Sequence, residues 1–421
     1  MTKAVSQQFC RFCNTPLTET FADLGMSPSA NHYRRPDKMD SAEAFFPLHA
    51  RVCSSCHLVQ VGSYQTPEDL FSDYAYFSSF ASSWLAHMER YAETMTERLG
   101  LGSDSLVVEV ASNDGYLLQY FKERDVPVLG IEPAANVAET ARAKGIESRV
   151  EFFGIESGQR LKDEGRQADL LIGNNVLAHV PDLNDFVGGL KRALKPTGLL
   201  TMEFPHLHKL IELNQFDTIY HEHFSYFSAL TLVKVFAAHG LMLVDVDELP
   251  THGGSLRIHV VHDDSERAAA GQSEALNGVI AREKAAGLDQ IETYRDFAEK
   301  VRATKRGLLK FLIAAKTEGK TVVGYGAPAK GNTLLNYCGV RTDFLEYTVD
   351  RSPHKQGHAL PGVGIPIYAP ERIFQTKPDF VLILPWNLKD EIMKDMAGIA
   401  AWGGRFVTPI PEVTVYPTTS S

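Results

Sequence analysis

Four cysteines near the N-terminus have the residue type and spacing of a metal site. They form two C-x-x-C pairs, Cys10 with Cys13 and Cys53 with Cys56. Four thiolates complete the tetrahedral coordination of zinc and leave no position for water, so we predict a structural zinc ion rather than a catalytic one. Because the segment between the pairs is longer than in common zinc fingers, four buried or redox-active cysteines are the alternative.

The segment Glu-Val-Ala-Ser-Asn-Asp-Gly, which ends at Gly115, follows an apolar run typical of a buried strand and opens a predicted helix. Its small side chains and backbone amides allow a ligand to approach the main chain. The next predicted strand ends at Glu132, an acid placed to accept hydrogen bonds from ribose hydroxyls. Since Ala111 and Asn113 stand where a phosphate-binding loop has glycines, the pattern favours S-adenosylmethionine over a dinucleotide. The alternative is a tight strand-to-helix turn.

A polar segment after the next long strand candidate, Asn-Asn-Val-Leu-Ala-His-Val-Pro-Asp, ends at Asp182. It is similar to the segment that follows the fourth strand in many class I methyltransferases. His179 within it is either a base or, more often for a lone histidine, a packing or capping residue. The predicted cofactor contacts are Glu109, Ala111, Ser112, Asn113, Gly115, Glu132, Pro133, Asn174 and Asn175.

The densest group of proton-transfer side chains is Tyr-His-Glu-His-Phe-Ser-Tyr, from Tyr220 to Tyr226. A metal site there lacks a third ligand at a recognisable spacing, and a hydrogen-bonded structural cluster is a second alternative. We favour general acid–base catalysis, because a histidine near its ordinary pKa accepts a proton at neutral pH and a tyrosine hydroxyl stabilises an enolate.

Two further segments carry groups suited to contact a substrate. Tyr74 and Tyr76 precede a predicted helix at 83–99, and they either face a pocket or pack in a core. The loop Thr-His-Gly-Gly-Ser-Leu-Arg, which ends at Arg257, either grips a phosphate or turns a hairpin.

A glycine-rich segment, Gly-Tyr-Gly-Ala-Pro-Ala-Lys-Gly, begins at Gly324 and matches Gly-x-Gly-x-x-Ala, with Asp350 at the end of the following strand candidate. This pattern ordinarily suggests NAD. Lys330, beside the start of a predicted helix, would equally suit the pyrophosphate of any nucleotide diphosphate.

The elements around these motifs predict the fold class. Short, continuously apolar strands alternate with helical periodicity, which is typical of a parallel sheet covered on both faces; the strands lie at 106–110, 128–132, 168–175 and 198–204. Strands at 241–246 and 256–261 are expected to close this sheet as an antiparallel edge. Helical periodicity at 265–316 predicts a connecting helix or helix pair, and a second α/β unit follows it.

Composition limits the classes of function. The 421 residues are 44% hydrophobic, which suffices for packed cores, and 42 basic against 52 acidic residues give a net charge of −10. The excess of acid argues against a broad surface for nucleic acid. The N-terminus shows no apolar signal segment, no run approaches the roughly 18 apolar residues of a membrane span, and the cysteine pairs favour metal in a reducing compartment. We therefore expect a cytoplasmic protein with neither membrane nor nucleic-acid partners.

Together these motifs resemble the bacterial C-methyltransferases that act on nucleotide-linked keto-deoxysugars, from Cys10 to about Glu412. The segments that begin at Tyr220 and Gly324 are specific to that group, whereas the adenosylmethionine signature occurs in a very large superfamily. The resemblance implies an α/β protein whose class I methyltransferase Rossmann-like domain lies between an N-terminal zinc module and a C-terminal Rossmann-like α/β domain, with the sugar nucleotide in the cleft. We place these units, with a helical cap on the second and a helical connector as the third, at 1–66, 67–264, 265–317 and 318–421.

The resemblance also implies a reaction. A base removes the proton next to the ketone of a sugar, expected to be linked to dTDP, and the enolate attacks the sulfonium methyl of S-adenosylmethionine. Tyr220, Glu222 and His223 match the catalytic motif, with His223 as the base, while Tyr76 (or Tyr74) and His179 match accessory positions.

The pattern assigns no role to His221. The predicted substrate contacts are Tyr74, His252, Gly253, Arg257, Gly326 and Lys330. The alternatives are a methyltransferase with a non-sugar acceptor, an NAD-dependent oxidoreductase that uses the loop at Gly324, and a non-enzymatic scaffold built on the zinc module.

Overall fold

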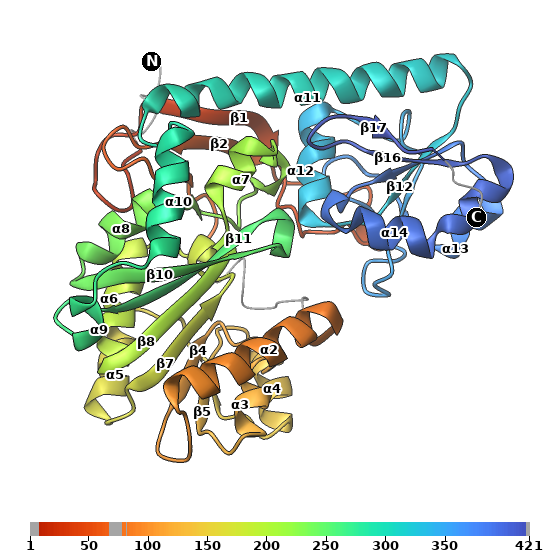
Figure 1. The fold of residues 1–421 in the computed structure, drawn as a ribbon. Coiled ribbons are helices and arrows are strands. Elements are labelled where there is room, and N and C mark those ends of the chain that lie inside the picture. Colours follow the sequence, from red (N-terminus) through yellow and green to blue (C-terminus); the bar gives the residue numbers. More distant parts are fainter. Residues whose placement is uncertain (1–7, 67–77, 81, 418–421) are drawn as a thin grey trace.

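The computed structural model describes residues 8–66, 78–80 and 82–417. Three β-sheets frame the protein (Figure 1): an N-terminal sheet at the upper left, a large central sheet below it and a C-terminal sheet on the right, with helix α11 lying along the top. Within the described ranges, no helix is both long and apolar enough to cross a membrane.

The N-terminal sheet is antiparallel, and its strands follow the order β1 (Glu19–Ser27), β2 (Phe46–Val52), β3 (Val59–Val61) and β9 (Ser225–Tyr226). Its last strand comes from far along the chain, because Tyr226 pairs with Val59 and Ser225 with Gln60. The segment that is rich in proton-transfer groups is therefore built into the sheet of the cysteine module.

The central sheet has seven strands in the order β10 (Leu241–Leu249), β11 (Ser255–His262), β8 (Leu194–Pro205), β7 (Ala168–Asn174), β4 (Val107–Val110), β5 (Val128–Ile131) and β6 (Ser148–Arg149). Strands β4 to β8 are parallel, and β11 is antiparallel to both of its neighbours. This is the strand order of class I methyltransferases, and it confirms the predicted antiparallel edge.

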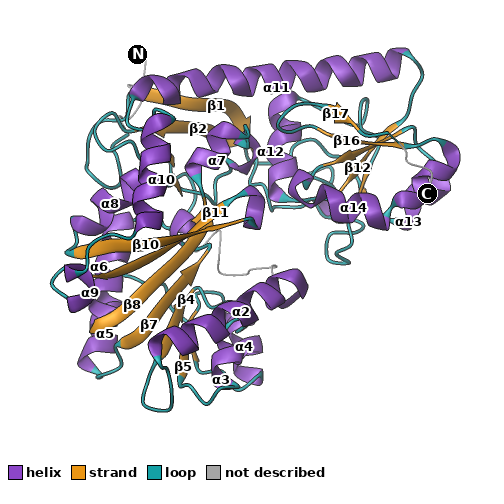
Figure 2. Ribbon diagram, in the orientation of Figure 1, coloured by secondary structure: helices purple, strands orange, loops and turns teal. Residues whose placement is uncertain are grey.

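Helices cover both faces of the central sheet (Figure 2). Consecutive residues of a strand pack in different hydrophobic cores, one on each face of the sheet. Val107 and Leu170 pack in one core, and Val108 and Leu171 pack in the other. That arrangement explains why these strands are continuously apolar. The first core includes α2 (Ser82–Leu99), α3 (Leu118–Lys122) and α4 (Ala135–Ala143), and the second includes α5 (Ile155–Asp163), α6 (Leu183–Ala193), α8 (Ala229–Ala237) and α10 (Glu274–Ala285).

The C-terminal sheet is parallel except for its last strand and has the order β14 (Ile367–Tyr368), β13 (Thr348–Val349), β12 (Val322–Tyr325), β15 (Phe380–Ile383), β16 (Arg405–Thr408) and β17 (Thr414–Val415). Its helices are α12 (Ala329–Cys338), α13 (Glu371–Thr376) and α14 (Lys389–Asp395).

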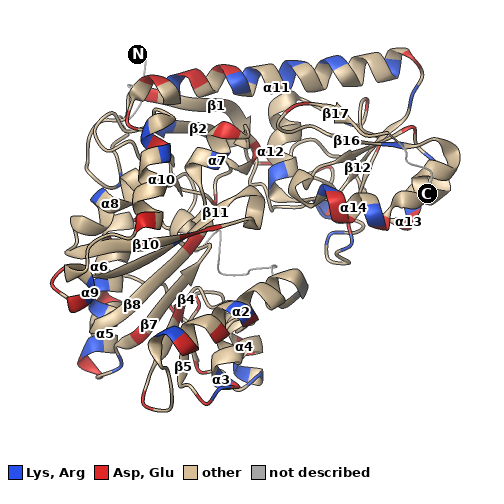
Figure 3. Cartoon of the chain, viewed as in Figure 1, with Lys and Arg blue, Asp and Glu red and all other residues tan. Residues whose placement is uncertain are grey.

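Helix α11 (Ile291–Thr317) joins the N-terminal and C-terminal sheets. Its 27 residues span about 40 Å at 1.5 Å per residue, long enough to lie over both (Figure 1). Phe297 stacks on Phe21 of β1 with ring centroids 4.5 Å apart, and Leu312 packs in the same hydrophobic core as Val322 of β12. Its acidic side chains all lie between Glu292 and Glu299, whereas basic side chains continue as far as Lys316 (Figure 3), and Arg302 pairs with Glu299. The two outer sheets thus share one core.

The described residues also contain the shorter elements α7 (Leu207–Glu212), α9 (Glu266–Ala269) and the 3-10 turns η1 (Pro36–Lys38), η2 (Ser78–Phe80), η3 (Leu177–His179), η4 (Phe216–Thr218), η5 (Thr251–Gly253), η6 (Trp386–Leu388) and η7 (Ala397–Trp402).

The predicted fold class is confirmed, with differences in detail. In the second α/β unit, the apolar runs at 344–350 and 364–368 contribute strands of only two residues each, because only those residues pair with a neighbour. The turn-rich region between the cysteine pairs contains two strands of the N-terminal sheet, which polar composition did not predict. The domain boundaries stay predictions, and β9 shows that the sheets exchange segments across them.

Candidate active site

The loop after β4 adopts a backbone that is unusual for its sequence. Ala111, Asn113 and Gly115 have φ of 58°, 49° and 75°, and a left-handed conformation costs a non-glycine residue roughly 1 kcal/mol. Tertiary contacts hold the loop in this shape: the Asn113 side-chain oxygen accepts a hydrogen bond from the Ser78 amide at 2.9 Å. The loop is therefore shaped by its surroundings, as expected of a ligand site.

Glu132, at the end of β5, fixes the same loop from the opposite side. Its two carboxylate oxygens accept hydrogen bonds from the amides of Asn113 and Ala134, both at 2.9 Å, and Pro133 lies between Glu132 and Ala134 in the chain. Burial raises the pKa of Glu132, and the hydrogen bonds from Ala134 and Asn113 oppose that shift. Each carboxylate oxygen keeps a second lone pair, so the acid still suits ribose hydroxyls.

Buried polar atoms beside the loop fit a polar ligand. Among the described residues, Ser112 Oγ and Asn174 Oδ1 are buried without a hydrogen-bond partner. Glu109 is also fully buried, and burial raises its pKa well above the ordinary value. Since buried polar groups are normally satisfied, such a cluster is typical of a site completed by a bound molecule. The predicted residues of the cofactor site are thus brought together.

Trp84 on α2 covers this site from the side of the helix. Its ring lies 6.1 Å from that of Tyr116 and 5.8 Å from that of His252, measured between centroids. His252 also lies close to Asn175, with Nε2 and the amide nitrogen 3.4 Å apart. Residues from four segments of the chain therefore lie together along one side of the site.

His223 is held in its neutral form. Its Nδ1 lies 2.9 Å from the carbonyl oxygen of Thr218, and because a carbonyl only accepts, Nδ1 carries the proton and the lone pair is on Nε2. Burial lowers the pKa of His223 well below its ordinary value, and neighbouring His179 lowers it further. The ring of Tyr220 lies 3.9 Å from that of His223. The base and the phenol predicted from sequence are thus adjacent.

His179 and Glu222 are the neighbours of His223 and Tyr220. His179 Nδ1 lies 2.8 Å from the Glu222 carbonyl oxygen, and its ring is 4.8 Å from that of His223. Burial lowers the pKa of His179 to about 4. Burial also raises the pKa of Glu222 to about 7, although its carboxylate accepts a hydrogen bond of 2.7 Å from Asn31.

His221, which the sequence pattern left without a role, packs into the N-terminal module. Its ring contacts those of Phe46 and Tyr64, at 5.9 and 6.4 Å, and Nε2 lies 3.3 Å from the Pro47 carbonyl oxygen. It is 4% exposed. His221 thus packs the segment that contains it against β2 of the N-terminal module.

The four cysteines predicted to bind zinc converge. Their sulfur atoms all lie within 4.8 Å of one another, with Cys10 3.6 Å from Cys56 and Cys13 3.4 Å from Cys53. Tetrahedral zinc with bonds of about 2.3 Å separates its sulfur ligands by about 3.8 Å, so the cluster fits the ion. Gln60 donates a hydrogen bond to Cys10 Sγ at 3.2 Å and supports the site from the sheet.

Arg11, between two of the cysteines, ties the module to the loop between η3 and α6. Its guanidinium donates to the carbonyl oxygens of Val61 at 2.6 Å and Pro181 at 3.0 Å. Pro181 follows His179 by two residues, so the metal-stapled loop supports the accessory histidine.

The C-terminal unit reaches the site through Trp386. Its indole nitrogen donates a hydrogen bond of 2.7 Å to the carboxylate of Asp217, a fully buried acid whose pKa burial raises to about 6. The ammonium of Lys330 lies 4.6 Å from the centre of the same indole ring and bonds to Asn387 at 2.7 Å. A β-carbon on Gly253 would stand 2.8 Å from Trp386, so this glycine permits close packing of the two units.

Four of the predicted site residues remain to be placed: Arg257, Gly326, Tyr74 and Tyr76. Arg257 is not a free cation of a phosphate loop, because its guanidinium is buried and forms an ion pair with Glu203 at 2.5 Å. Gly326 has φ of 89° and turns the chain before α12, where the Asp350 carboxylate accepts hydrogen bonds from the amides of Ala327 and Ser352. Tyr74 and Tyr76 lie outside the described residues.

Sequence reasoning missed several residues of the site, namely Trp84, Glu203, Asp217, Asn31 and Trp386. Each sits in an ordinary strand, turn or helix and carries no motif. Only the position of Asp217, three residues before Tyr220, could have drawn notice.

Comparison with known proteins identifies the units. Residues 10–71 match a zinc binding domain, residues 84–246 a methyltransferase domain and residues 250–411 a C-methyltransferase C-terminal domain. The chain is 37% identical to the C-methyltransferase NovU of Streptomyces niveus over 415 residues, which cover 98% of this chain and 97% of that relative. The chain belongs to the C-methyltransferase family.

Two further proteins are similar to only part of this C-methyltransferase. A ubiquinone biosynthesis O-methyltransferase of Chelativorans sp. (strain BNC1) is 27% identical over 95 residues, 22% of this chain and 38% of that relative. The solved structure of a Burkholderia thailandensis 1,6-didemethyltoxoflavin-N1-methyltransferase has a TM-score of 0.34 and 15% identity, and it covers 48% of this chain and 93% of its own. Membership of the family makes S-adenosylmethionine the methyl donor of this enzyme and zinc the metal of its four-cysteine cluster.

The zinc site is expected to hold the catalytic segment in place. Cys13→Ser removes one thiolate, so zinc content should fall and amide exchange in 218–228 should rise at least tenfold, because β9 loses its partner sheet. Affinity for S-adenosylmethionine should change less than about threefold. Elemental analysis, hydrogen exchange and calorimetry measure the three quantities. Cys338→Ala, a buried cysteine outside the cluster, is the control, and unchanged exchange in Cys13→Ser would contradict this role.

The depressed pKa of His223 predicts a pH dependence of stability. The unfolded chain binds a proton here near pH 6.5 and the folded chain only at much lower pH, so stability is present above pH 6.5 and is lost as the pH falls through it. Between pH 7.5 and 5.5 the free energy of unfolding should fall by about 1 kcal/mol more in the wild type than in His223→Gln. Urea unfolding at both pH values measures this difference, and an equal fall in both proteins would contradict the burial of a neutral His223.

Proposed function

We propose that this C-methyltransferase methylates a carbon next to the ketone of a nucleotide-linked keto-deoxysugar, with His223 as the base. The observation that carries the proposal is the hydrogen bond from His223 Nδ1 to the Thr218 carbonyl beside the ring of Tyr220, which presents a neutral imidazole with its lone pair on Nε2. A carbon nucleophile requires such a base, because a carbon-bound proton has to be removed before the carbon can attack a methyl group.

The low pKa of His223 has two consequences for the chemistry. It keeps the imidazole neutral, and so able to accept the proton, throughout the neutral pH range. It also makes the imidazole a weak base, so most of the barrier has to be lowered by stabilising the enolate oxygen. We assign that task to the phenol of Tyr220. Glu222 and His179 are positioning residues in this scheme. The Glu222 carboxylate accepts a hydrogen bond from Asn31, and His179 Nδ1 bonds to the Glu222 carbonyl oxygen.

The bound donor supplies an electrophilic methyl group to the enolate carbon. The residues of this chain that hold it are those of the loop after β4 together with Glu132 and the two asparagines after β7. Trp84 and the neighbouring apolar surface exclude water from that side, which preserves the enolate long enough to react.

Lys330 is our candidate for the nucleotide part of the acceptor. Its side chain is half-buried and its ammonium lies against neutral partners, Trp386 and Asn387, while the carboxyl that affects its pKa is that of Asp217, whose own pKa is raised. A half-buried cation with so little compensation attracts a diphosphate. Lys330 follows the carboxyl end of β12 and lies over Trp386, which packs on Gly253 of the methyltransferase unit, so it is placed to connect the two halves of the proposed substrate. We propose a cytoplasmic location, because reduced thiolates are required for the zinc site.

The direct test is mass spectrometry of the enzyme incubated with S-adenosylmethionine and a panel of nucleotide-linked 3-keto- and 4-keto-deoxysugars. We expect one sugar to gain a methyl group on carbon, and His223→Gln to abolish this gain while S-adenosylmethionine affinity changes less than about threefold. Failure of every sugar to gain a methyl group, with donor binding intact, would contradict the acceptor class.

Lys330→Gln separates the nucleotide contact from the chemistry. It should raise the KM of the nucleotide-linked sugar about tenfold and leave kcat within about threefold. Lys305→Gln is the matched control, because Lys305 also lies over an aromatic ring, that of Tyr337 at 4.7 Å, but on α11. An unchanged KM in Lys330→Gln would remove Lys330 from the site.

A further inference from the structure

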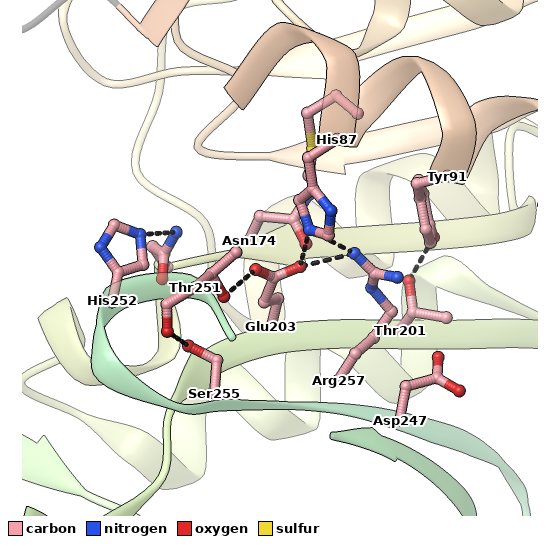
Figure 4. Close-up of polar contacts among 12 residues, drawn as sticks. His87, Tyr91, Asn174, Thr201, Glu203, Asp247, Thr251, His252, Ser255 and Arg257 are labelled. Atoms are coloured by element: carbon pink, nitrogen blue, oxygen red, sulfur yellow. Dashed lines mark hydrogen bonds and ion pairs between the residues drawn. The ribbon is translucent and has the colours of Figure 1, made fainter. Parts of the chain in front are cut away.

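A buried carboxylate that the proposed reaction does not use lies under the donor side of the site. Glu203, near the end of β8, is fully buried and stands between Asn174 of β7 and Arg257 of β11 in the sheet register. Figure 4 shows side chains from several elements converging on it. A buried charge is costly unless it is fully paired, so its partners indicate what the arrangement achieves.

The partners of Glu203 come from three separate elements. Oε2 lies 2.5 Å from the guanidinium of Arg257 and 3.0 Å from His87 Nε2 on α2, and Oε1 accepts a hydrogen bond of 2.9 Å from the hydroxyl of Thr251 (Figure 4). Burial by itself would raise the pKa of Glu203, but the hydrogen bond from His87 and the charge of Arg257 lower it overall. Glu203 is therefore ionised, with Arg257 as its counter-charge.

Two of these contacts lead directly to the walls of the site. Thr251 precedes His252, which has a left-handed backbone with φ of 54° and lies against Asn175. His87 follows Trp84 by one helical turn, and their rings are 5.3 Å apart. Trp84 and His252 in turn contact each other, with centroids 5.8 Å apart.

We propose that Glu203 is a positioning residue that sets α2 and the loop at Thr251 in one fixed relation, and so places Trp84 and His252 for methyl transfer. Arg257 neutralises the carboxylate and is held by the ring of Tyr91, 4.3 Å from its guanidinium carbon. One carboxylate oxygen serves the helix and the other serves the loop. Loss of either contact therefore uncouples the position of α2 from that of the loop at Thr251.

The first test uses amide hydrogen exchange and needs no acceptor, so it is independent of the proposed sugar chemistry. His87→Leu removes the contact on α2, and we expect exchange at 252–254 to rise at least fivefold in the presence of S-adenosylhomocysteine, although His87 is on another element. His87→Gln, which keeps an N–H donor, should restore most of the protection. Tyr91→Phe is the control, because it removes an equally buried bond from α2, to Thr201 at 2.5 Å, that does not involve Glu203. Unchanged exchange at 252–254 in His87→Leu would overturn the proposal.

The second test is a double-mutant cycle on methyl transfer and rests on the proposed function for its substrate. Thr251→Val and His87→Leu should each lower kcat about tenfold, and the double variant should lie within about twofold of the slower single variant, because both act through one carboxylate. Thr251→Ser, which keeps the hydroxyl, should retain wild-type kcat. A product of the two effects, about a hundredfold loss, would show independent contacts and overturn the proposal. If the wild type transfers no methyl group to any sugar, only the proposed function fails, and the exchange experiment still decides on Glu203.

Discussion

The arrangement of the active site depends on one constraint: the segment 217–228 is bound on every side by a different unit of the protein. Asp217 bonds to Trp386 of the C-terminal unit, and Glu222 bonds to Asn31 of the zinc module. Ser225 and Tyr226 form the last strand of the N-terminal sheet. His223 therefore sits in a segment that cannot move without breaking contacts to the N-terminal module, the central sheet or the C-terminal unit. This explains why a metal site and a second α/β unit accompany a methyltransferase domain.

Burial of this segment also determines which side chains of the site are charged. Histidines that are surrounded by protein have lowered pKa values and are neutral, while the carboxyls of Glu222 and Asp217 have raised pKa values, about 7 and about 6. Each of these groups destabilises the fold when its charged form is buried, and the shared core of the outer sheets, with α11 across it, offsets that cost. Ionised Glu203 is the exception, because Arg257 lies against it in the adjacent strand.

How far the sequence predicts this site depends on whether a residue acts through local spacing or through distant contacts. The four cysteines and the turn ending at Gly115 were predictable, since their spacing alone specifies a knuckle and a strand-to-helix loop. The ion pair of Arg257 was not predictable, because nothing local reveals that Glu203 faces it across β8 and β11. For His221 the reason is similar: its contacts with Phe46 and Pro47 exist only after the N-terminal sheet takes up β9.

The most direct test of His223 as the base separates proton removal from methyl transfer. The enzyme is incubated in D₂O with S-adenosylhomocysteine, which has no methyl group to give, and a nucleotide-linked keto-deoxysugar, and deuterium at the carbon next to the ketone is followed by NMR. The structure predicts exchange in the wild type that is at least a hundredfold faster than in His223→Gln, with equal binding of S-adenosylhomocysteine. Equal exchange in the two proteins would contradict the assignment, because a group other than His223 would then remove the proton.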